Sequence, residues 1–353
     1  MAAGDFTASV LPDVIIKINE MFSGKRHTPE LNTPIETIKA LAERQTVRFD
    51  KVDVLLDHMD CRGCKVVWLK DCTNDVVNGI DTPITSCDIT GNETESTYLS
   101  VANNLAYYDT FSVKEEDCKD AFSAAEKIAY LMATTMAALE VKINLAGIAF
   151  LVANNQAPAD DMGYTINGSD VLEVPKASIT PAFLADIAVM AELSNLYSPF
   201  LVSGKNFYTA NFLAEYRSAG SDHVDGALGS FPIVWDIKNM DTTVGADATF
   251  VVDPSSYVFW GSNQYQNEAP EMRAGDSKTL VWKQRAPRLM FNNAGTLVPV
   301  YFDITYQKTC SVTSGTEYTN HIFRVLFRGG LQLGPQVCDS GDTGILQINA
   351  ITE

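Results

Sequence analysis

The sequence predicts an α+β protein with a mixed sheet, one dominant helix and several long arms. Residues 117–154 repeat apolar side chains three or four positions apart, which is the spacing of one helix face. Before and after that stretch, short segments alternate or run apolar as strands do. Cap-and-proline pairs, most clearly Thr180 before Pro181, mark the starts of further helices. The 353 residues, 46% of them hydrophobic and 20% charged, suffice for a sizeable folded core.

Composition also limits the function. The formal net charge of -18 opposes a nucleic-acid binder that works by neutralising phosphates, because such a protein needs the opposite sign. The first residues lack the basic region and apolar core of a secretory signal. We therefore expect the seven cysteines to be reduced thiols, and their odd number cannot pair fully within one chain.

Residues 1–45 are predicted to form a helical arm. A first helix is expected over 12–22, and a capping box at Thr33-Pro34-Ile35-Glu36, with Pro34 at the first helical position, starts a second. One face of the second helix holds Ile35, Ile38, Leu41 and Ala42. This arm either lies on a neighbouring subunit or packs on the chain's own core, and the sequence leaves both open.

Residues 46–113 change to strand character. Strand-like runs at 47–55 and 66–69 flank a turn at 60–63, and further strands are expected at 98–101 and 107–113. Between them lies a polar excursion over 82–97. A loop of this length without its own core generally has a function or a partner.

The predicted long helix, residues 117–154, would run roughly 57 Å. Its charged residues argue against a membrane span, because no uninterrupted apolar run approaches about 18 residues. Regular charges beside the apolar stripe, as in a coiled coil, are missing, so packing against a sheet is favoured. The stripe consists of Phe122, Ala125, Ala129, Met132, Met136, Leu139, Ile143, Ala146 and Phe150, and the charges are Glu126, Lys127, Glu140 and Lys142.

The remainder is predicted to mix helices and strands. Helices are expected over 180–193, from Gly204 onward, and from the cap at Asp253-Pro254 through Tyr257 and Trp260. The first of them aligns Phe183, Ile187, Met190 and Leu193. Strands are expected at 164–174 with a turn at Asn167-Gly168, and at 233–235, 248–252, 280–282, 298–306, 322–327 and 345–351.

This order of elements resembles the major capsid proteins of tailed bacteriophages, which have the Hong Kong ninety-seven-type capsid fold. In that family an N-terminal arm, an extended β loop, a long spine helix and an axial domain with a central sheet follow one another. Residues 222–236 resemble the family's axial-domain strand, and residues 248–257 its strand-into-helix step. The resemblance assigns the arm to 1–45, the extended β loop to 46–113, the peripheral domain with its spine helix (117–154) to 114–179, the axial domain to 180–297 and the closing strands to 298–353.

The resemblance implies a structural protein of the virion, made in the host cytoplasm. It implies self-assembly through hexamers and pentamers into an icosahedral shell around double-stranded DNA, without sequence-specific DNA contacts and without a membrane. A separate scaffolding protein, a portal and decoration proteins are further expected partners. Contacts between subunits are expected around residues 66–70 and 98–101. An encapsulin-type nanocompartment shell, which holds cargo enzymes, is the alternative within the same fold.

No catalytic constellation stands out, so we predict no catalytic residue, no cofactor and no metal site. The CxxC turn Cys61-Arg62-Gly63-Cys64 would need further ligands for zinc, and it lies between strands, unlike a redox CxxC motif that opens a helix. A metal-binding or redox protein built on this turn is the alternative from a different class. The triplet Asp342-Thr343-Gly344 matches aspartic proteases but lies too near the last residue for their lobe. His27, His58, His223 and His321 have no motif context.

Overall fold

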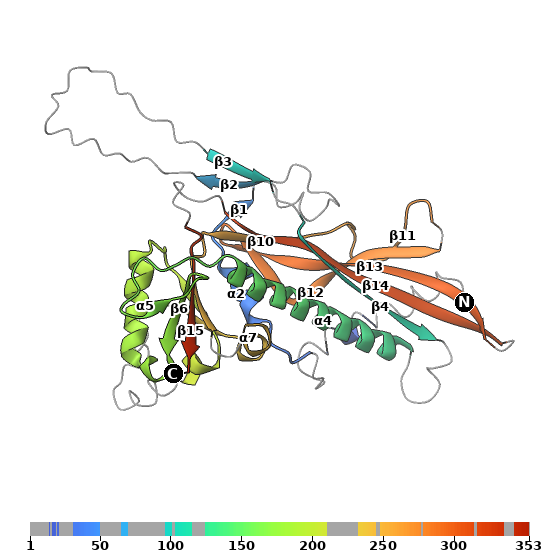
Figure 1. The fold of residues 1–353 in the computed structure, drawn as a ribbon. Helices are drawn as coiled ribbons and strands as arrows, with labels where there is room; N and C mark the ends of the chain where they lie inside the picture. The colour runs from blue at the N-terminus through green and yellow to red at the C-terminus, as the bar shows by residue number, and fades with distance from the viewer. Residues whose placement is uncertain are drawn as a thin grey trace, which may run out of the picture.

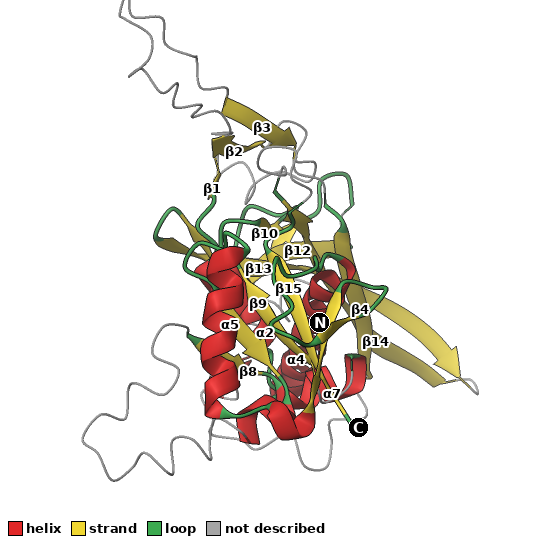
Figure 2. Ribbon diagram, turned by 60° about the vertical axis from the view of Figure 1, so that its left-hand side comes forward, coloured by secondary structure: helices red, strands yellow, loops and turns green. Residues whose placement is uncertain are grey.

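The computed structural model describes residues 31–49, 65–69, 96–100, 103–114, 124–209, 232–244, 248–276, 278–313, 316–334 and 342–352, together with 14, 16–18 and 20. The protein is α+β, and its described strands form one three-stranded and two six-stranded sheets (Figures 1 and 2). One long helix, α4 (Ala124–Ala153), lies against the larger body of strands.

The described N-terminal residues pack on the chain's own core. Val14 and Ile18 are helical and buried, and Lys17 Nζ lies 2.9 Å from Glu126 Oε1 of α4. Helix α2 (Glu36–Arg44) buries the predicted face against α4 and the sheet, with Ile38 and Leu41 over Gly147. Of the two open possibilities for the second helix, packing on the chain's own core is therefore confirmed.

The predicted capping box is wrong. Helix α2 begins at Glu36 with Ile35 as its N-cap residue, and no side chain caps it. An N-cap carbonyl normally accepts the first bond inside the helix. Here the carbonyl of Thr33 accepts a hydrogen bond from Arg288 Nη1 at 2.7 Å, and the Thr33 hydroxyl accepts one from Lys238 Nζ at 3.4 Å.

A three-stranded antiparallel sheet stands apart from the body (Figures 1 and 2). It consists of β1 (Arg48–Phe49), β2 (Lys65–Leu69) and β3 (Ser96–Ser100), with β2 in the middle. Val67 lies opposite both Arg48 and Tyr98. The strands predicted at 66–69 and 98–101 are thus found, and the turn at 60–63 lies outside the described residues.

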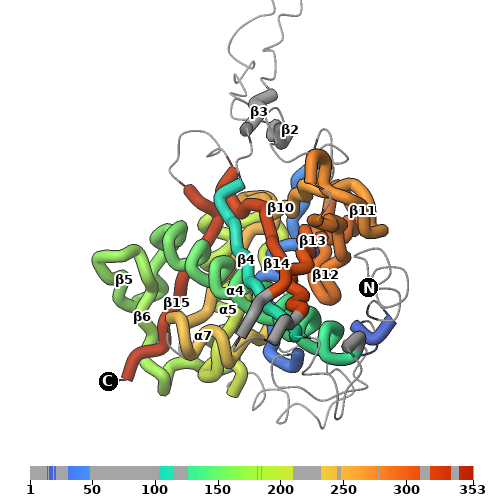
Figure 3. Tube along the Cα trace, turned by 90° about the vertical axis from the view of Figure 1, so that its right-hand side faces the viewer, coloured from blue at the N-terminus to red at the C-terminus, as the bar shows by residue number. Residues whose placement is uncertain are grey.

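The first six-stranded sheet is antiparallel throughout. Its buried face meets α4, and β4 lies along β14 (Figures 1 and 3). The β13–β14 pair extends far beyond the other strands on one side (Figure 1). The strands are β10 (Tyr257–Ser262), β14 (Thr316–Leu333), β13 (Thr296–Thr313), β12 (Thr279–Asn293) and β11 (Glu271–Met272) in this order, with β4 (Leu105–Lys114) pairing β14.

Strand β10 replaces the short helix predicted from Asp253-Pro254 through Trp260, and that prediction is wrong. Asp253 Oδ1 accepts from the Ser255 N–H at 2.8 Å and from its hydroxyl at 2.7 Å, which makes a local turn instead of a helix cap. Every residue of β10 is buried, and the strand pairs with β14 from Tyr257 to Ser262. Burial on both faces and strand pairing therefore overrode the local cap signal.

The second six-stranded sheet is mixed, as predicted. Its order is β5 (Thr165–Ile166), β6 (Val171–Pro175), β15 (Ile345–Ile351), β9 (Ala248–Val252), β7 (Phe200–Ser203) and β8 (Ile233–Trp235). The pairs β15–β6 and β7–β8 are parallel. Short elements, η3 (Lys176–Ser178) and α7 (Ile237–Thr243), lie between its strands in sequence.

Helix α5 (Pro181–Leu193) accompanies the mixed sheet and follows the sequence prediction closely. The hydroxyl of Thr180 accepts a hydrogen bond from the Phe183 N–H, which is the predicted cap. Phe183, Ile187 and Met190 are buried in a separate apolar cluster with the sheet. Leu193, the fourth residue expected on that face, is instead 48% exposed.

The long helix α4 is confirmed over its described length, and its buried face is wider than the predicted stripe. Met132, Met136 and Ile143 are fully buried, and so is Glu140. By length and composition alone, Glu126–Ala153 could cross a membrane, a weak criterion that the core helix of a globular protein also meets. Half of the most apolar window is buried inside the fold.

Candidate functional site

The residues expected to contact other subunits lie in the separate three-stranded sheet. Val66 pairs with Leu99 and Val67 with Tyr98, so the structure brings the two predicted segments side by side. Lys70 and Val101, the last residue of each segment, lie outside the described residues. Among the described strands, β1, β2 and β3 pair only with one another.

The sheet-bearing excursion, residues 46–102, starts at an anchor formed by Gln45. Its Nε2 donates to the Phe259 carbonyl at 2.9 Å and to the Asn292 carbonyl at 2.7 Å, and its Oε1 accepts from the Phe259 N–H at 2.6 Å. Asn292 Nδ2 in turn donates to the Gln45 carbonyl at 2.9 Å. Gln45 is fully buried. Strands β10 and β12 thereby fix the point where the chain leaves the body.

The excursion ends at a second anchor formed by two asparagines. Asn104 exchanges two hydrogen bonds with Leu331 of β14, one from its Nδ2 to the carbonyl at 2.8 Å and one to its Oδ1 from the N–H at 3.0 Å. Asn103 Oδ1 accepts from Trp260 Nε1 at 3.3 Å and from the Ser262 hydroxyl at 3.1 Å. Both ends of the excursion are therefore held at β10 and its neighbouring strands. Sequence reasoning missed these amides, for which consecutive asparagines between two strands were the only signal.

A buried polar junction ties α2, α4 and α7 together. Asp236 Oδ2 accepts from Thr37 Oγ1 at 2.8 Å and from Asn144 Nδ2 at 2.7 Å. Its Oδ1 accepts from Asn239 Nδ2 at 2.6 Å, and Asn144 Oδ1 accepts from the Ile38 N–H at 2.8 Å. Since buried polar groups are costly unless they are bonded, this satisfied network fixes how the three helices meet.

A buried ion pair between α4 and β12 holds the segment that precedes α2. Glu140 Oε2 lies 2.6 Å from Arg288 Nε, and Glu140 Oε1 accepts from the Arg288 N–H at 3.1 Å. Arg288 lies where the β12–β13 register shifts, and its Nη1 also donates to the Leu31 carbonyl at 3.2 Å. Burial raises the pKa of Glu140, and the Arg288 guanidinium offsets part of that rise. Glu140, expected as a charge against a membrane span, is thus a core residue.

The described residues hold no group of three or more metal-binding side chains. Cys61 and Cys64 lie outside the described residues, as do His27, His58 and His223, and Cys310 is an exposed free thiol. His321 is buried, with its Nδ1 2.9 Å from the Tyr306 hydroxyl. Gly344 of the Asp342-Thr343-Gly344 triplet accepts from the Asp253 N–H at 2.9 Å, so the triplet serves as a structural loop. Among the described residues, the polar side chains named above hold segments of the chain in place, and none of them forms a cluster suited to catalysis.

No protein-family model matches the chain, and neither does any curated protein. The solved structures that resemble it include bacteriophage capsids, the class of protein that the sequence resembles. The capsid structure of the cyanophage P-SCSP1u matches with a TM-score of 0.44 and 9% identity over 88% of each chain. The mature capsid of bacteriophage PhiM1 matches with 0.39 and 10% over 82% of each chain.

A structure from Mycobacterium phage Adephagia matches with a TM-score of 0.41 and 10% identity over 94% of each chain. The identities and TM-scores are low in all three cases.

Proposed function

We propose that this chain is a major capsid protein, a structural protein that self-assembles through hexamers and pentamers into an icosahedral shell around the double-stranded DNA of a tailed bacteriophage. The observation that carries the proposal is the three-stranded sheet β1–β3, held away from the body with both ends of its excursion anchored at β10. The order of elements along the chain, which resembles this family, supports the same function.

With strands of only two, five and five residues, this sheet forms few strand-to-strand hydrogen bonds and would gain stability from packing on a further surface. In a shell that surface would belong to a neighbouring subunit. The side chains of Gln45 and Asn104 bind the two ends of the excursion to the backbone of β10 and β14, so the excursion can extend from the body while its ends stay fixed. Burial against a neighbour, and not chemistry, would then stabilise the shell.

The body supplies the rigid part of the proposed subunit. Helix α4, with 30 residues, spans about 45 Å and serves as the spine. We assign the antiparallel sheet with α4 to the peripheral domain and the mixed sheet with α5 to the axial domain. The border expected between 297 and 298 falls inside the β12–β13 ladder, where Leu297 pairs with Asn292, so β10–β12 join the peripheral domain in this division.

The proposed protein is not an enzyme and needs no cofactor. The net charge of -18 suits a shell that encloses DNA without gripping it. Its main partner is its own copies, and scaffolding, portal and decoration proteins remain expected partners in the virion. Synthesis in the host cytoplasm precedes assembly.

Electron microscopy and analytical ultracentrifugation of the full chain test this proposal. We expect closed shells with hexameric and pentameric units. A small monodisperse species under all assembly conditions would contradict both container functions. Nuclease-protected double-stranded DNA in particles from infected cells separates a capsid from an encapsulin-type shell. Stoichiometric zinc that is lost in a Cys61→Ser/Cys64→Ser variant would instead support the metal-binding alternative.

A further inference from the structure

The outward face of α5 is unusually apolar. A helix that is hydrophobic nearly all round is normally buried on all sides. Ala182, Ala185, Val189 and Leu193 are exposed on the side of α5 away from the sheet. Val189 is 47% and Leu193 48% exposed, and Tyr197, which follows the helix, is 77% exposed. This face therefore lacks the covering that its composition calls for.

Charges near this face sit at unfavourable helix ends. The carbonyl end of a helix repels negative charge and its amide end repels positive charge. Glu192 is exposed in the last turn of α5, which contains no basic residue. Lys205 is exposed in the first turn of the helix over residues 205–209. No ion pair joins either side chain to another described residue, so each lacks the opposite charge that would offset its position.

The charged and apolar side chains have the same spacing on α5 and on the 205–209 helix. Residues three apart on a helix face the same side. Val189 and Glu192 place an apolar side chain and an acid one turn apart on α5. Lys205 and Tyr208 place a base and an aromatic ring one turn apart on the other helix, and Tyr208 is 41% exposed with its ring edge-on to Trp235. The two surfaces are complementary in both charge and apolar contact.

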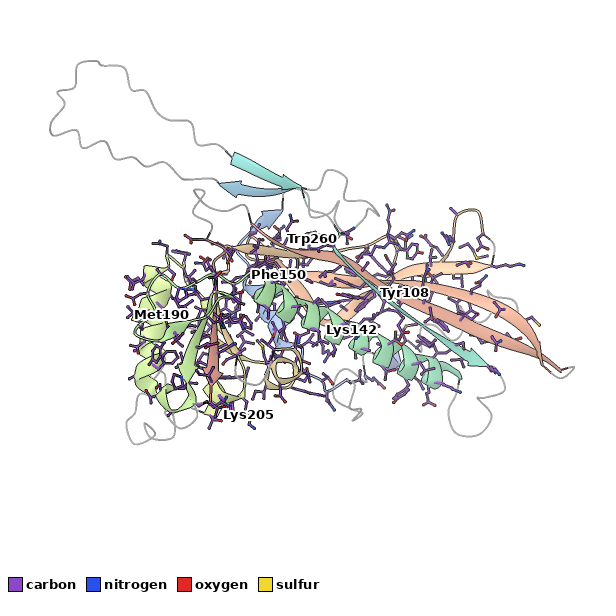
Figure 4. All side chains as sticks on the ribbon, viewed as in Figure 1. Tyr108, Lys142, Phe150, Met190, Lys205 and Trp260 are labelled. Carbon is purple, nitrogen blue, oxygen red and sulfur yellow. The ribbon has the colours of Figure 1, made fainter. Side chains whose placement is uncertain are left out.

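We infer that the outward face of α5 packs against the Lys205–Tyr208 surface of a second copy of this chain, with Glu192 facing Lys205 and Val189 facing Tyr208. The helix that carries Lys205 packs beside the start of α5, where the rings of Phe183 and Phe207 lie 6.1 Å apart, whereas Val189 and Glu192 lie toward the other end of α5, beside the labelled Met190 (Figure 4). The contact thus joins two different surfaces of neighbouring copies. Repeated head to tail, such a contact forms a closed ring when the rotation from one copy to the next divides a full turn evenly. The inference rests on the proposed function, because it describes how copies meet within one ring-shaped unit of the shell.

Local charge complementarity, and not net charge, favours a second copy as the occupant. Two copies that each carry -18 repel one another, so they approach best where an acid meets one of the few exposed bases. The apolar residues around that pair exclude water and strengthen the attraction between the charges.

A charge swap in the full chain tests the inference. Glu192→Lys and Lys205→Glu should each weaken the association of copies about tenfold, measured by sedimentation velocity, because like charges then face each other. The double variant Glu192→Lys/Lys205→Glu should restore association to within about twofold of the unaltered protein. Lys142→Glu, on the exposed side of α4 (Figure 4), makes the same change of charge elsewhere and should associate normally.

Cysteines at Val189 and Tyr208 provide a second test. On oxidation, Val189→Cys/Tyr208→Cys should form longer disulfide-linked ladders of copies than either single variant or the unaltered protein, whose seven native cysteines set the background. If the unaltered protein assembles and the swapped double variant is as defective as the single variants combined, this contact is wrong while the shell function stands. If the unaltered protein never assembles, both the inference and the proposed function fail.

Discussion

The side chain of Gln45 pairs with the backbone of Phe259 as a neighbouring strand residue would. Its Nε2 donates to the Phe259 carbonyl at 2.9 Å, and its Oε1 accepts from the Phe259 N–H at 2.6 Å. The two residues lie 214 positions apart in the chain. One amide thereby satisfies backbone groups of β10 and fixes the start of the excursion that carries β1, β2 and β3.

Gln45→Ala should destabilise the folded body. Removal of the amide takes a hydrogen-bond partner from the Phe259 N–H, the Phe259 carbonyl and the Asn292 carbonyl, which costs roughly 2–4 kcal/mol in free energy of unfolding. Urea denaturation followed by circular dichroism measures this loss. Thr46→Ala, at the exposed neighbouring residue, is the matched control. A loss for Gln45→Ala no larger than the control's would show that the anchor is unimportant.

Glu140→Ala should destabilise the protein more than most substitutions. It leaves the largely buried guanidinium of Arg288 without its partner, and breaking a buried pair in this way costs about 3–5 kcal/mol. Glu140→Gln keeps the shape and one acceptor, so a smaller loss is expected. Equal unfolding midpoints in urea for the alanine variant and the unaltered protein would contradict the importance of the pair.

Stability should fall as the pH rises from about 4 to about 6, because of Asp303. Burial raises the pKa of this carboxyl from 3.8 to about 6, although the N–H groups of Gln264 and Tyr265 oppose the rise. In this range the folded state holds a proton that the unfolded state has lost, so the free energy of unfolding decreases with pH and levels off above about 6. The full effect is on the order of 2–3 kcal/mol.

Asp303→Asn removes the titrating group and should flatten this part of the pH profile. Urea unfolding of both proteins between pH 4 and about 7 makes the comparison. Asp276→Asn is a suitable control, because the hydrogen bonds from Thr279 and Lys278 lower the pKa of the half-buried Asp276 carboxyl and so place its titration below this pH range. An unchanged slope in the Asp303→Asn variant would assign the pH dependence to other groups.

Gly330→Ala should destabilise the antiparallel sheet. A Cβ at this position of β14 would overlap the indole ring of Trp260, which lies directly opposite in β10. Overpacking of a close-packed core costs typically about 1–3 kcal/mol. Gly168→Ala, at an open turn where an added Cβ meets no atom within 4 Å, should be nearly neutral in the same thermal unfolding experiment.

Val67→Pro should separate assembly from folding. Val67 belongs to the middle strand of the three-stranded sheet, and proline there removes an N–H and disrupts a central strand. We expect the loss of shells in electron micrographs with an unchanged thermal midpoint of the body. Val67→Thr keeps β propensity and should assemble. Normal shells from the proline variant would mean that this sheet is dispensable for assembly.

Local patterns predicted the elements whose structure is decided by near neighbours. Thr180 before Pro181 identified the start of α5, and the apolar spacing of Met132, Met136 and Ile143 identified the buried side of α4. Short runs of β-prone residues likewise predicted the strands at 66–69 and 98–101, which pair in the structure. Patterns of this kind did not reveal Gln45 or Asn104, because a polar residue shows its partner only when distant strands arrive beside it.

The sequence by itself determined the α+β class, the long helix, most strands and the acidic balance, since composition and periodicity act within a few residues. Tertiary structure alone decided that residues 257–262 form β10, because β14 supplies pairing and burial from about seventy positions away. It also decided that Glu140 is a core residue and that Thr33 does not cap α2, since Arg288 reaches both from far along the chain. In each case a long-range partner satisfied groups that local signals had assigned elsewhere.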